Sequence, residues 1–301
     1  MSRTIQLQGS AALARLLVAI VHDPASLKRA MARSVAGPGS CFSSEGATVK
    51  TVVRSFFEWF GELGLFGASL ARAAVKPPYE FRESVRQMDE VGSKSLPLVA
   101  LAGAAMGVVL SLQTRDSLIR FGAESLQPAV IVMSIIQETG PIITALVVCG
   151  RVAAGIGAEL GSMKVTEQID AIEASAVNPF KFLVATRVLA CICMLPLLTL
   201  AADFTGILMG WIATTAADPI SFNLYWEQGT KNLAFRDFLP ATFRTAIFGL
   251  IIGLIGCFQG IRTKGGTEGV GRSATGAVVL ASLFVIVADV LLVRLILIFF
   301  R

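Results

Sequence analysis

The sequence predicts an all-α integral membrane protein with about five transmembrane helices. Hydrophobic residues make up 54% of the chain, charged residues make up 16%, and the mean hydropathy is +0.71, which together exclude a soluble globular domain. The apolar residues gather in runs near the ~20 residues that a helix needs to cross a bilayer. Charged segments separate these runs, so the chain is expected to cross the membrane several times.

Five apolar runs are long enough to span. They are residues 95–114, 128–150, 183–216, 241–261 and 275–300. The third run is the least regular, because its 34 residues would reach roughly 50 Å as a helix, too long for one straight span and too short for two spans and a turn. We expect one helix, kinked near Pro196, with Asp203 near its outer boundary. A six-span arrangement stays open.

The basic residues predict the orientation. With the amino terminus inside, Lys and Arg number 19 in the segments that face the cytoplasm and 5 in those on the other side. Cytoplasmic segments of membrane proteins carry an excess of these residues. The amino terminus is therefore expected to be cytoplasmic.

Three regions follow one another along the chain. Residues 1–48 form an amino-terminal extension to which the sequence assigns no role. Residues 49–94 are expected to form an interfacial helix and a connecting helix, because residues 49–75 mix aromatic and charged side chains in the way of helices at the headgroup boundary. Residues 95–301 form the transmembrane domain.

Glu138 is the most informative polar residue within the spans. It lies about ten residues into the second span, roughly 15 Å deep by helical rise and close to the midplane. A carboxylate at that depth is costly unless it faces protein or water. Gly140 and Pro141 follow, so the helix is expected to be distorted there. Glu138 either contacts a polar or cationic part of a substrate in a cavity or is a paired structural acid.

Other charged residues within the spans leave alternatives open. Asp289 lies at a similar depth in the last span and can pair with Arg294 or across helices, as a structural ion pair or in transport. Arg244 lies one turn into the fourth span, where it either extends its side chain to the interface or guides anionic headgroups.

Residues 159–180 form a charged segment between the second and third spans. Its apolar residues follow a 4, 3, 4 spacing that predicts one stripe on an amphipathic helix, namely Val165, Ile169, Ile172 and Ala176. Asn178 and Pro179 are expected to stop this helix. Four carboxylates from Glu159 to Glu173 oppose Lys164 alone, which favours docking in a protein groove over lying on anionic lipid.

Several motifs together resemble the MlaE/YrbE family of permeases, the membrane subunits of lipid-transporting ABC systems. The motifs are residues 138–141 (ETGP), 150–154 (GRVAA), 159–173 (ELGSMKVTEQIDAIE) and 259–272 (QGIRTKGGTEGVGR). The resemblance covers roughly residue 49 to the end. It implies an MlaE-like fold, with an interfacial helix, about five spans and a cytoplasmic coupling helix between the second and third spans.

The resemblance also implies partners and site residues. The expected partners are a second permease copy, a cytoplasmic ABC ATPase (MlaF-like), a periplasmic MCE-domain protein (MlaD-like) and, in some systems, a STAS-domain protein (MlaB-like). The lipid-cavity candidates are Glu138, Gln137, Arg244 and Asp289. The residues of the ATPase-coupling helix are Glu159, Met163, Lys164, Val165, Glu167, Ile169, Asp170, Ile172 and Glu173.

The expected function is phospholipid transport between the bacterial inner membrane and periplasmic MCE-domain partners, which maintains the lipid asymmetry of the outer membrane. The chain has no phosphate-loop motif, so ATP and Mg are expected in the partner ATPase and no cofactor is expected here. No catalytic set, metal site or nucleic-acid partner is expected. An ion-coupled secondary transporter using Glu138 and Asp289, and a membrane scaffold without transport, are the alternatives.

Overall fold

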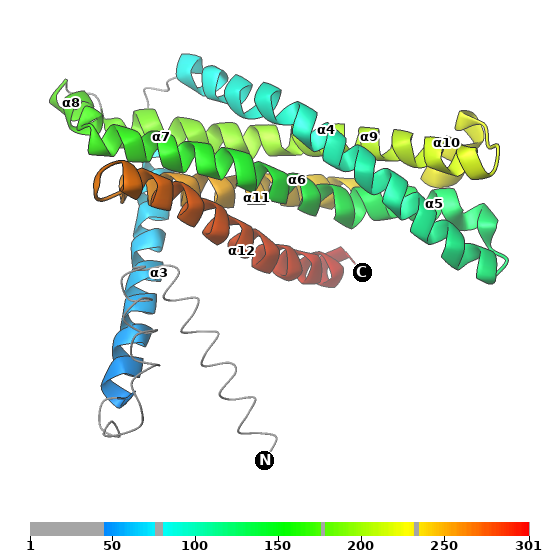
Figure 1. Ribbon diagram of the computed structural model, residues 1–301, viewed down its shortest axis with the longest axis horizontal. Helices are drawn as coiled ribbons and strands as arrows, with labels where there is room; N and C mark the ends of the chain where they lie inside the picture. Colours follow the sequence, from blue (N-terminus) through cyan, green and yellow to red (C-terminus); the bar gives the residue numbers. More distant parts are fainter. Residues whose placement is uncertain (1–44, 76–80, 176–177, 232–234, 301) are drawn as a thin grey trace. The chain divides into compact units, whose positions relative to one another are not determined.

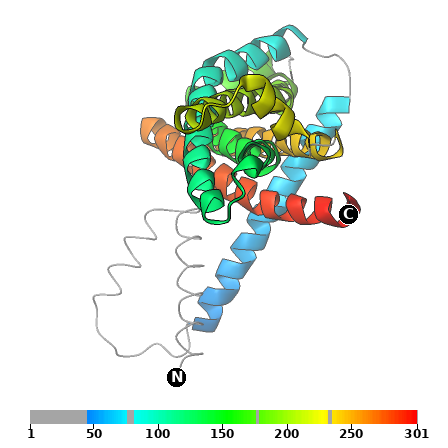
Figure 2. The same ribbon diagram turned by 90° about the vertical axis from the view of Figure 1, so that its right-hand side faces the viewer.

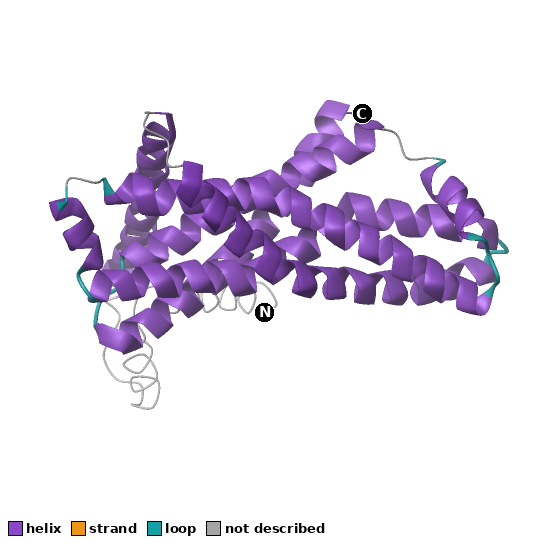
Figure 3. Cartoon of the chain, turned by 90° about the horizontal axis from the view of Figure 1, so that it is seen from above, coloured by secondary structure: helices purple, strands orange, loops and turns teal. Residues whose placement is uncertain are grey.

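The computed structural model describes residues 45–75, 81–175, 178–231 and 235–300, and within those ranges every regular element is a helix (Figure 3). The chain divides into two compact units, residues 1–69 and 70–301. The division falls inside the first described helix, α3 (Glu45–Val75). The all-α class predicted from composition is confirmed.

Helix α3 agrees with the predicted amino-terminal helix and begins four residues earlier, at Glu45 in place of residue 49. The rings of Trp59 and Phe60 meet edge to face with their centroids 5.2 Å apart. Its position along the headgroup boundary stays a prediction. The extension predicted at residues 1–48 lies outside the described residues as far as residue 44.

The second unit is a bundle of long helices (Figure 1). Its elements, in order, are α4 (Phe81–Arg120), η1 (Glu124–Leu126), α5 (Gln127–Ser134), η2 (Ile135–Thr139), α6 (Gly140–Val148), η3 (Cys149–Ala153), α7 (Ala154–Val165), α8 (Gln168–Ala174), η4 (Phe180–Ala185), α9 (Thr186–Ala217), α10 (Phe222–Thr230), α11 (Phe235–Ile261) and α12 (Gly266–Phe300). Helices α8 and α10 lie at opposite ends of this bundle (Figure 1).

Five stretches are long and apolar enough to cross a membrane, which confirms the five-span prediction. They are Phe81–Arg120, Glu124–Val165, Phe180–Ala216, Pro240–Ile261 and Gly266–Ile296. The third stretch continues through Pro196 as one helix, so the six-span alternative is wrong. The polar helix predicted before the first span is also confirmed, because α4 runs without interruption from Phe81.

Small residues let α4 and α9 approach closely. Gly103 and Gly107 lie one turn apart on α4, and a Cβ atom on either would overlap the backbone of Ala202 or Gly206 on α9. Membrane helices associate through such small residues, because lipid tails provide little hydrophobic drive for helix pairing. This close packing makes α4 and α9 one tightly joined pair.

Helix α11 lies between two partners and also uses glycine on both sides. Gly249 and Gly253 face the backbone of α9, while Gly256 and Gly260 face α7. The apolar windows of the second, third and fourth spans are accordingly 50–61% buried, whereas those of α4 and α12 are only 22% buried. Helices α4 and α12 therefore keep large apolar faces for lipid or for another chain.

Replacing Gly107 with Ala is expected to destabilise the α4–α9 pair. The added methyl group would overlap the carbonyl oxygen of Gly206, and such overpacking typically costs about 1–3 kcal/mol. Thermal unfolding of the purified chain in detergent measures the loss. Gly150→Ala is the matched control, because nothing lies within 4 Å of its new methyl group. Equal melting temperatures for the two variants would contradict the packing argument.

Candidate functional site

The second span changes its hydrogen-bonding register where Glu138 lies. Residues Ile135–Thr139 form the π-helical turn η2, in which the N–H of Gly140 donates to the carbonyl of Ile135. Such a turn inserts one extra residue into a helix and frequently accompanies a functional site. The side chain of Glu138 is exposed. The distortion predicted from Gly140 and Pro141 is confirmed, and it presents a carboxylate on the surface of the bundle.

The carbonyl of Gln137 needs an external donor. In an α-helix it would accept a bond from the N–H of residue 141, but that residue is proline and has none. The guanidinium of Arg244 on α11 donates to this carbonyl instead. The same guanidinium lies 3.2 Å from a carboxylate oxygen of Asp289 on α12. Arg244 therefore joins the second, fourth and fifth spans.

This arrangement excludes one of the two alternatives for Arg244, namely that its side chain extends to the membrane interface. Its side chain is 3% exposed, and that of Asp289 is 17% exposed. Because the guanidinium finds a carbonyl and a carboxylate inside the bundle, it need not reach water. Of the two pairings left open for Asp289, the structure shows the one across helices.

A cavity of about 550 Å³ opens beside the π-turn. Its lining comes from α4, η2, α6 and α12 and consists of Met106, Glu138, Thr139, Ile142, Ile143, Asp289, Val290, Val293 and Arg294. The walls are mostly apolar, with two carboxylates and one guanidinium. The structure thus brings Glu138 and Asp289 to one cavity. Arg244 forms an ion pair with Asp289 and also donates to the carbonyl of Gln137.

The segment between the second and third spans is not one helix. Helix α7 continues the second span to Val165, and the chain then turns at Glu167, whose φ of 57° is left-handed. Helix α8 begins at Gln168. Non-glycine residues seldom adopt this conformation, so the turn is a defined break. The predicted stripe is consequently divided, with Val165 on α7 and Ile169 on α8.

The apolar stripe of α8 and the residues after this helix also differ from the sequence-based prediction. Ile169 is buried within this chain and Ile172 is half-buried, while Ala176 lies outside the described residues. Asn178 starts the next helix where it was expected to stop the last one, because its side-chain oxygen accepts the N–H of Phe180 at 3.1 Å. Asparagine before a helix is a favourable cap, and Pro179 suits the first position of a helix.

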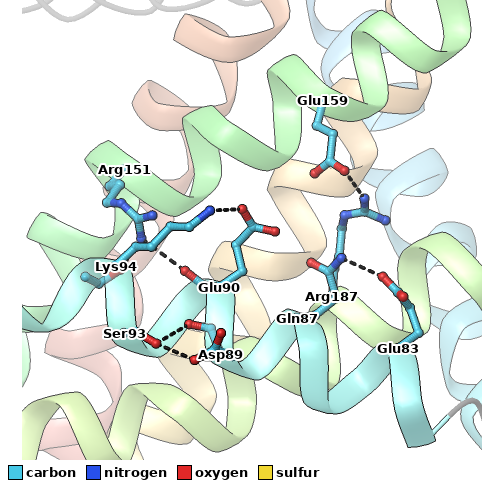
Figure 4. Close-up of polar contacts among 10 residues, drawn as sticks. Glu83, Gln87, Asp89, Glu90, Ser93, Lys94, Arg151, Glu159 and Arg187 are labelled. Atoms are coloured by element: carbon cyan, nitrogen blue, oxygen red, sulfur yellow. Dashed lines mark hydrogen bonds and ion pairs between the residues drawn. The ribbon is translucent and has the colours of Figure 1, made fainter.

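Two ion pairs join α7 to the helices that follow it. Arg187 at the start of α9 is buried, and its guanidinium lies 2.6 Å from the Glu159 carboxylate on α7 (Figure 4). It also donates to the carbonyl of Leu183 at 2.9 Å. Lys164 and Asp170 form a second pair at 3.0 Å, from the end of α7 to α8. The helix that enters the segment and the helix that leaves it are therefore tied together.

Figure 4 also shows how α4 is attached at this end of the bundle. Arg151 in η3 donates to the Ser95 hydroxyl at 2.6 Å and to the carbonyl of Glu90 at 3.4 Å. The Glu90 carboxylate pairs with Lys94 at 2.5 Å along the same helix. Arg151 belongs to the motif at residues 150–154, so that motif has a structural role in joining the first two spans.

Comparisons with known proteins agree with this architecture. A family model described as Permease MlaE matches residues 84–295. A probable ABC transporter permease protein of Rickettsia typhi is 35% identical over 80% of this chain and 93% of its own length. The intermembrane phospholipid transport system permease protein MlaE of Haemophilus influenzae is 31% identical over 80% of this chain and 92% of its own length. The chain belongs to the MlaE permease family.

A plant relative widens the range of this permease family. The chloroplastic protein TRIGALACTOSYLDIACYLGLYCEROL 1 of Arabidopsis thaliana is 30% identical over 79% of this chain and 68% of its own length. The five apolar helices and the family together make this permease a multi-pass membrane protein and a lipid-transport component. Since relatives are ABC transporter permeases, an ion-coupled secondary transporter is not favoured.

Two polar residues near the site were missed or misplaced by sequence reasoning. Asp203 was expected near the outer boundary, yet it is 7% exposed and packs directly against Gly140 in this permease. The acid in an apolar run was the available signal, but only the tertiary structure shows which turn it faces. Arg294 was considered only as a partner for Asp289, and the structure places it in the cavity lining.

Replacing Arg244 with Met is expected to destabilise this permease by about 3–5 kcal/mol, because it leaves the partly buried Asp289 without its cation. The double change Arg244→Met with Asp289→Leu should recover a large part of that loss, since neither charge then remains. Denaturant unfolding in detergent measures both values. A double variant no more stable than Arg244→Met would contradict the pairing.

Proposed function

We propose that this permease carries phospholipids between the inner membrane and a periplasmic MCE-domain protein, as the membrane subunit of an ABC transporter. The observation that carries the proposal is the cavity beside the π-turn, which combines apolar walls with Glu138, Asp289 and Arg294. Membership of the MlaE family supports the same conclusion. The Haemophilus influenzae relative, an intermembrane phospholipid transport system permease protein, supports phospholipid as the cargo class.

The lining suits an amphipathic cargo. Methionine and branched aliphatic side chains contact acyl chains without needing hydrogen bonds. A guanidinium binds phosphate strongly, and a carboxylate attracts an ammonium group. Arg294 and Glu138 are therefore the groups for the headgroup, while Arg244 keeps Asp289 in place beside them.

A second copy of the permease is expected to close the cavity. The cavity is bounded by α4 and α12, whose apolar windows are the least buried of the five spans. Pairing of two copies across these faces would bury apolar surface and enclose two cavities together. The homodimer is thus the assembly that this surface supports.

The ATPase is expected to bind at the α8 end. Helix α8 projects beyond the bundle as a short helix after a defined break, with its exposed side bearing carboxylates and the half-buried Ile172 (Figure 1). Because Ile169 is already buried in this chain, Ile172 is the large apolar side chain of α8 that remains for a partner. A push on α8 would pass through the Glu159–Arg187 pair into α7 and α9 together.

The charge distribution supports one membrane orientation. In that orientation the segments rich in Lys and Arg, with the amino terminus and the α8 end, would face the cytoplasmic side of the inner membrane. The MCE-domain protein would then meet the α10 end. ATP and Mg act in the ATPase, and a STAS-domain protein beside that ATPase is a further expected partner.

Replacing Glu138 with Gln is expected to lower lipid transfer by about 10- to 100-fold, because a hydrogen bond to a charged group contributes roughly 1.5–3 kcal/mol. The measurement is lipid transfer, together with lipid-stimulated ATP turnover, in proteoliposomes holding the whole transporter. Glu124→Gln is the matched control, an exposed carboxylate at the far end of the same span. Wild-type transfer by the Glu138 variant would exclude a headgroup role.

Replacing Ile172 with Asp is expected to abolish copurification of the ATPase, because a charge would enter an apolar contact. Ala174→Asp is the control, since it adds an acid to an exposed position of α8 on the opposite side of the helix from Ile172 and keeps the apolar side chain. Affinity purification in detergent, followed by immunoblotting, gives the result. Undiminished ATPase recovery with the Ile172 variant would rule out docking through this residue.

A further inference from the structure

An aromatic cluster lies at the α10 end of the bundle. The ring of Trp211 on α9 meets that of Phe222 edge to face at 5.3 Å, and Phe222 stacks on Trp226 with centroids 6.3 Å apart. Trp226 is 47% exposed and Phe222 is 41% exposed. The indole N–H of Trp211 donates to the carbonyl of Ile220 at 3.1 Å, which fixes the connection from α9 to α10. Neither the cavity nor the coupling segment uses these residues.

Helix α10 has three distinct faces. Tyr225 and Gly229 are buried against the bundle, and Asn223 and Glu227 are exposed on the opposite face. The aromatic pair, four residues apart, lies on one flank between these two faces. Leu224 is exposed on the other flank. A helix with its polar face outward and apolar flanks at its sides is suited to the headgroup boundary.

The cluster continues an apolar surface of the third span. Phe204 on α9 is highly exposed, and Trp211 lies seven residues later, on the same face and about 10 Å further along the helix. In a multi-pass protein such a face meets acyl chains, and Trp is enriched where that face reaches the headgroups. The apolar surface thus runs from Phe204 through Trp211 to the aromatic pair on α10.

The charges at this end do not provide an electrostatic attraction to anionic lipid. Residues 115–126 and 218–231 carry three basic and four acidic side chains. One of the basic side chains, Arg115, is already paired with Asp218 at 3.0 Å. Membrane contact here must therefore come from apolar and aromatic burial and not from attraction to anionic headgroups.

We propose that α10 lies in the headgroup layer of the membrane, held there by Trp226, Phe222 and Trp211, and that it binds zwitterionic phospholipid as readily as anionic phospholipid. Figure 2 views the bundle from this end, with α10 beside α5. Tyr225 packs in one cluster with Ile131 of α5 and Ile135 of the π-turn. Since Glu138 follows the start of α5 by roughly 16 Å of helical rise, this contact sets the cavity near the midplane.

The test places a single tryptophan at residue 226 by Trp59→Phe and Trp211→Phe, in the full chain in phosphatidylcholine vesicles. Lipids brominated either near the headgroup or near the chain end quench its fluorescence from the membrane, and iodide quenches from water. We expect headgroup-level bromine to quench at least about twofold more than chain-end bromine, with little effect of iodide. Added phosphatidylglycerol should leave this pattern unchanged.

Two further variants complete the design, and in both Phe replaces the three native tryptophans so that an aromatic ring stays at each position. Glu227→Trp is the matched control on the outward face and should be quenched by iodide and not by brominated lipid. Leu224→Trp, on the second flank, should behave like Trp226. The proposal is overturned if Trp226 is reached by iodide and by neither lipid, since the flank then faces water and is open to a protein partner. Stronger quenching from chain-end bromine, or quenching that requires phosphatidylglycerol, would overturn it equally.

Discussion

The buried guanidinium of Arg244 is the contact on which the middle of this permease depends. Proline at position 141 leaves the Gln137 carbonyl without its helical donor, and a carbonyl unpaired inside a membrane costs several kcal/mol. Arg244 satisfies that carbonyl and is itself neutralised by Asp289. Each of the three groups would be costly alone. Together they stabilise a π-turn that presents Glu138 beside the cavity.

Close packing at glycine residues fixes the positions of the helices around this polar contact. Because α4 joins α9 and α11 joins both α9 and α7 at backbone distance, the second, third and fourth spans leave little room for rearrangement. Closely packed helices transmit displacement better than they absorb it. Helices α4 and α12 both leave most of their apolar windows exposed, since each window is only 22% buried. The cavity lies between these two helices, beside the π-turn, where the least buried spans of the bundle meet.

Sequence reasoning recovered what depends on composition and local chemistry. Span number, the helical class and the distortion at Gly140 and Pro141 all follow from hydropathy and proline chemistry. The family resemblance, and no local pattern, grouped Glu138 with Asp289, which line one cavity. Sequence reasoning failed where a residue far away in the sequence determines the position of a side chain. Arg244 extends inward because Gln137 and Asp289 lie within reach, and Asp203 is buried because Gly140 leaves room for it. The residues of each contact lie far apart in the sequence, so no short stretch of sequence could predict these contacts.

The break between α7 and α8 is another feature that the sequence pattern did not predict. It bears on how movement of α8 could reach the other helices. The 4, 3, 4 spacing describes a continuous helix, but Glu167 adopts a left-handed conformation and starts α8 in a new direction. A continuous rod would pass any force along the second span alone. If the proposed ATPase moves α8, the Lys164–Asp170 pair would link that movement to α7, and the Glu159–Arg187 pair would link α7 to α9. Since α9 is packed against α4 and α11, the movement would then reach the helices on both sides of the π-turn around Glu138.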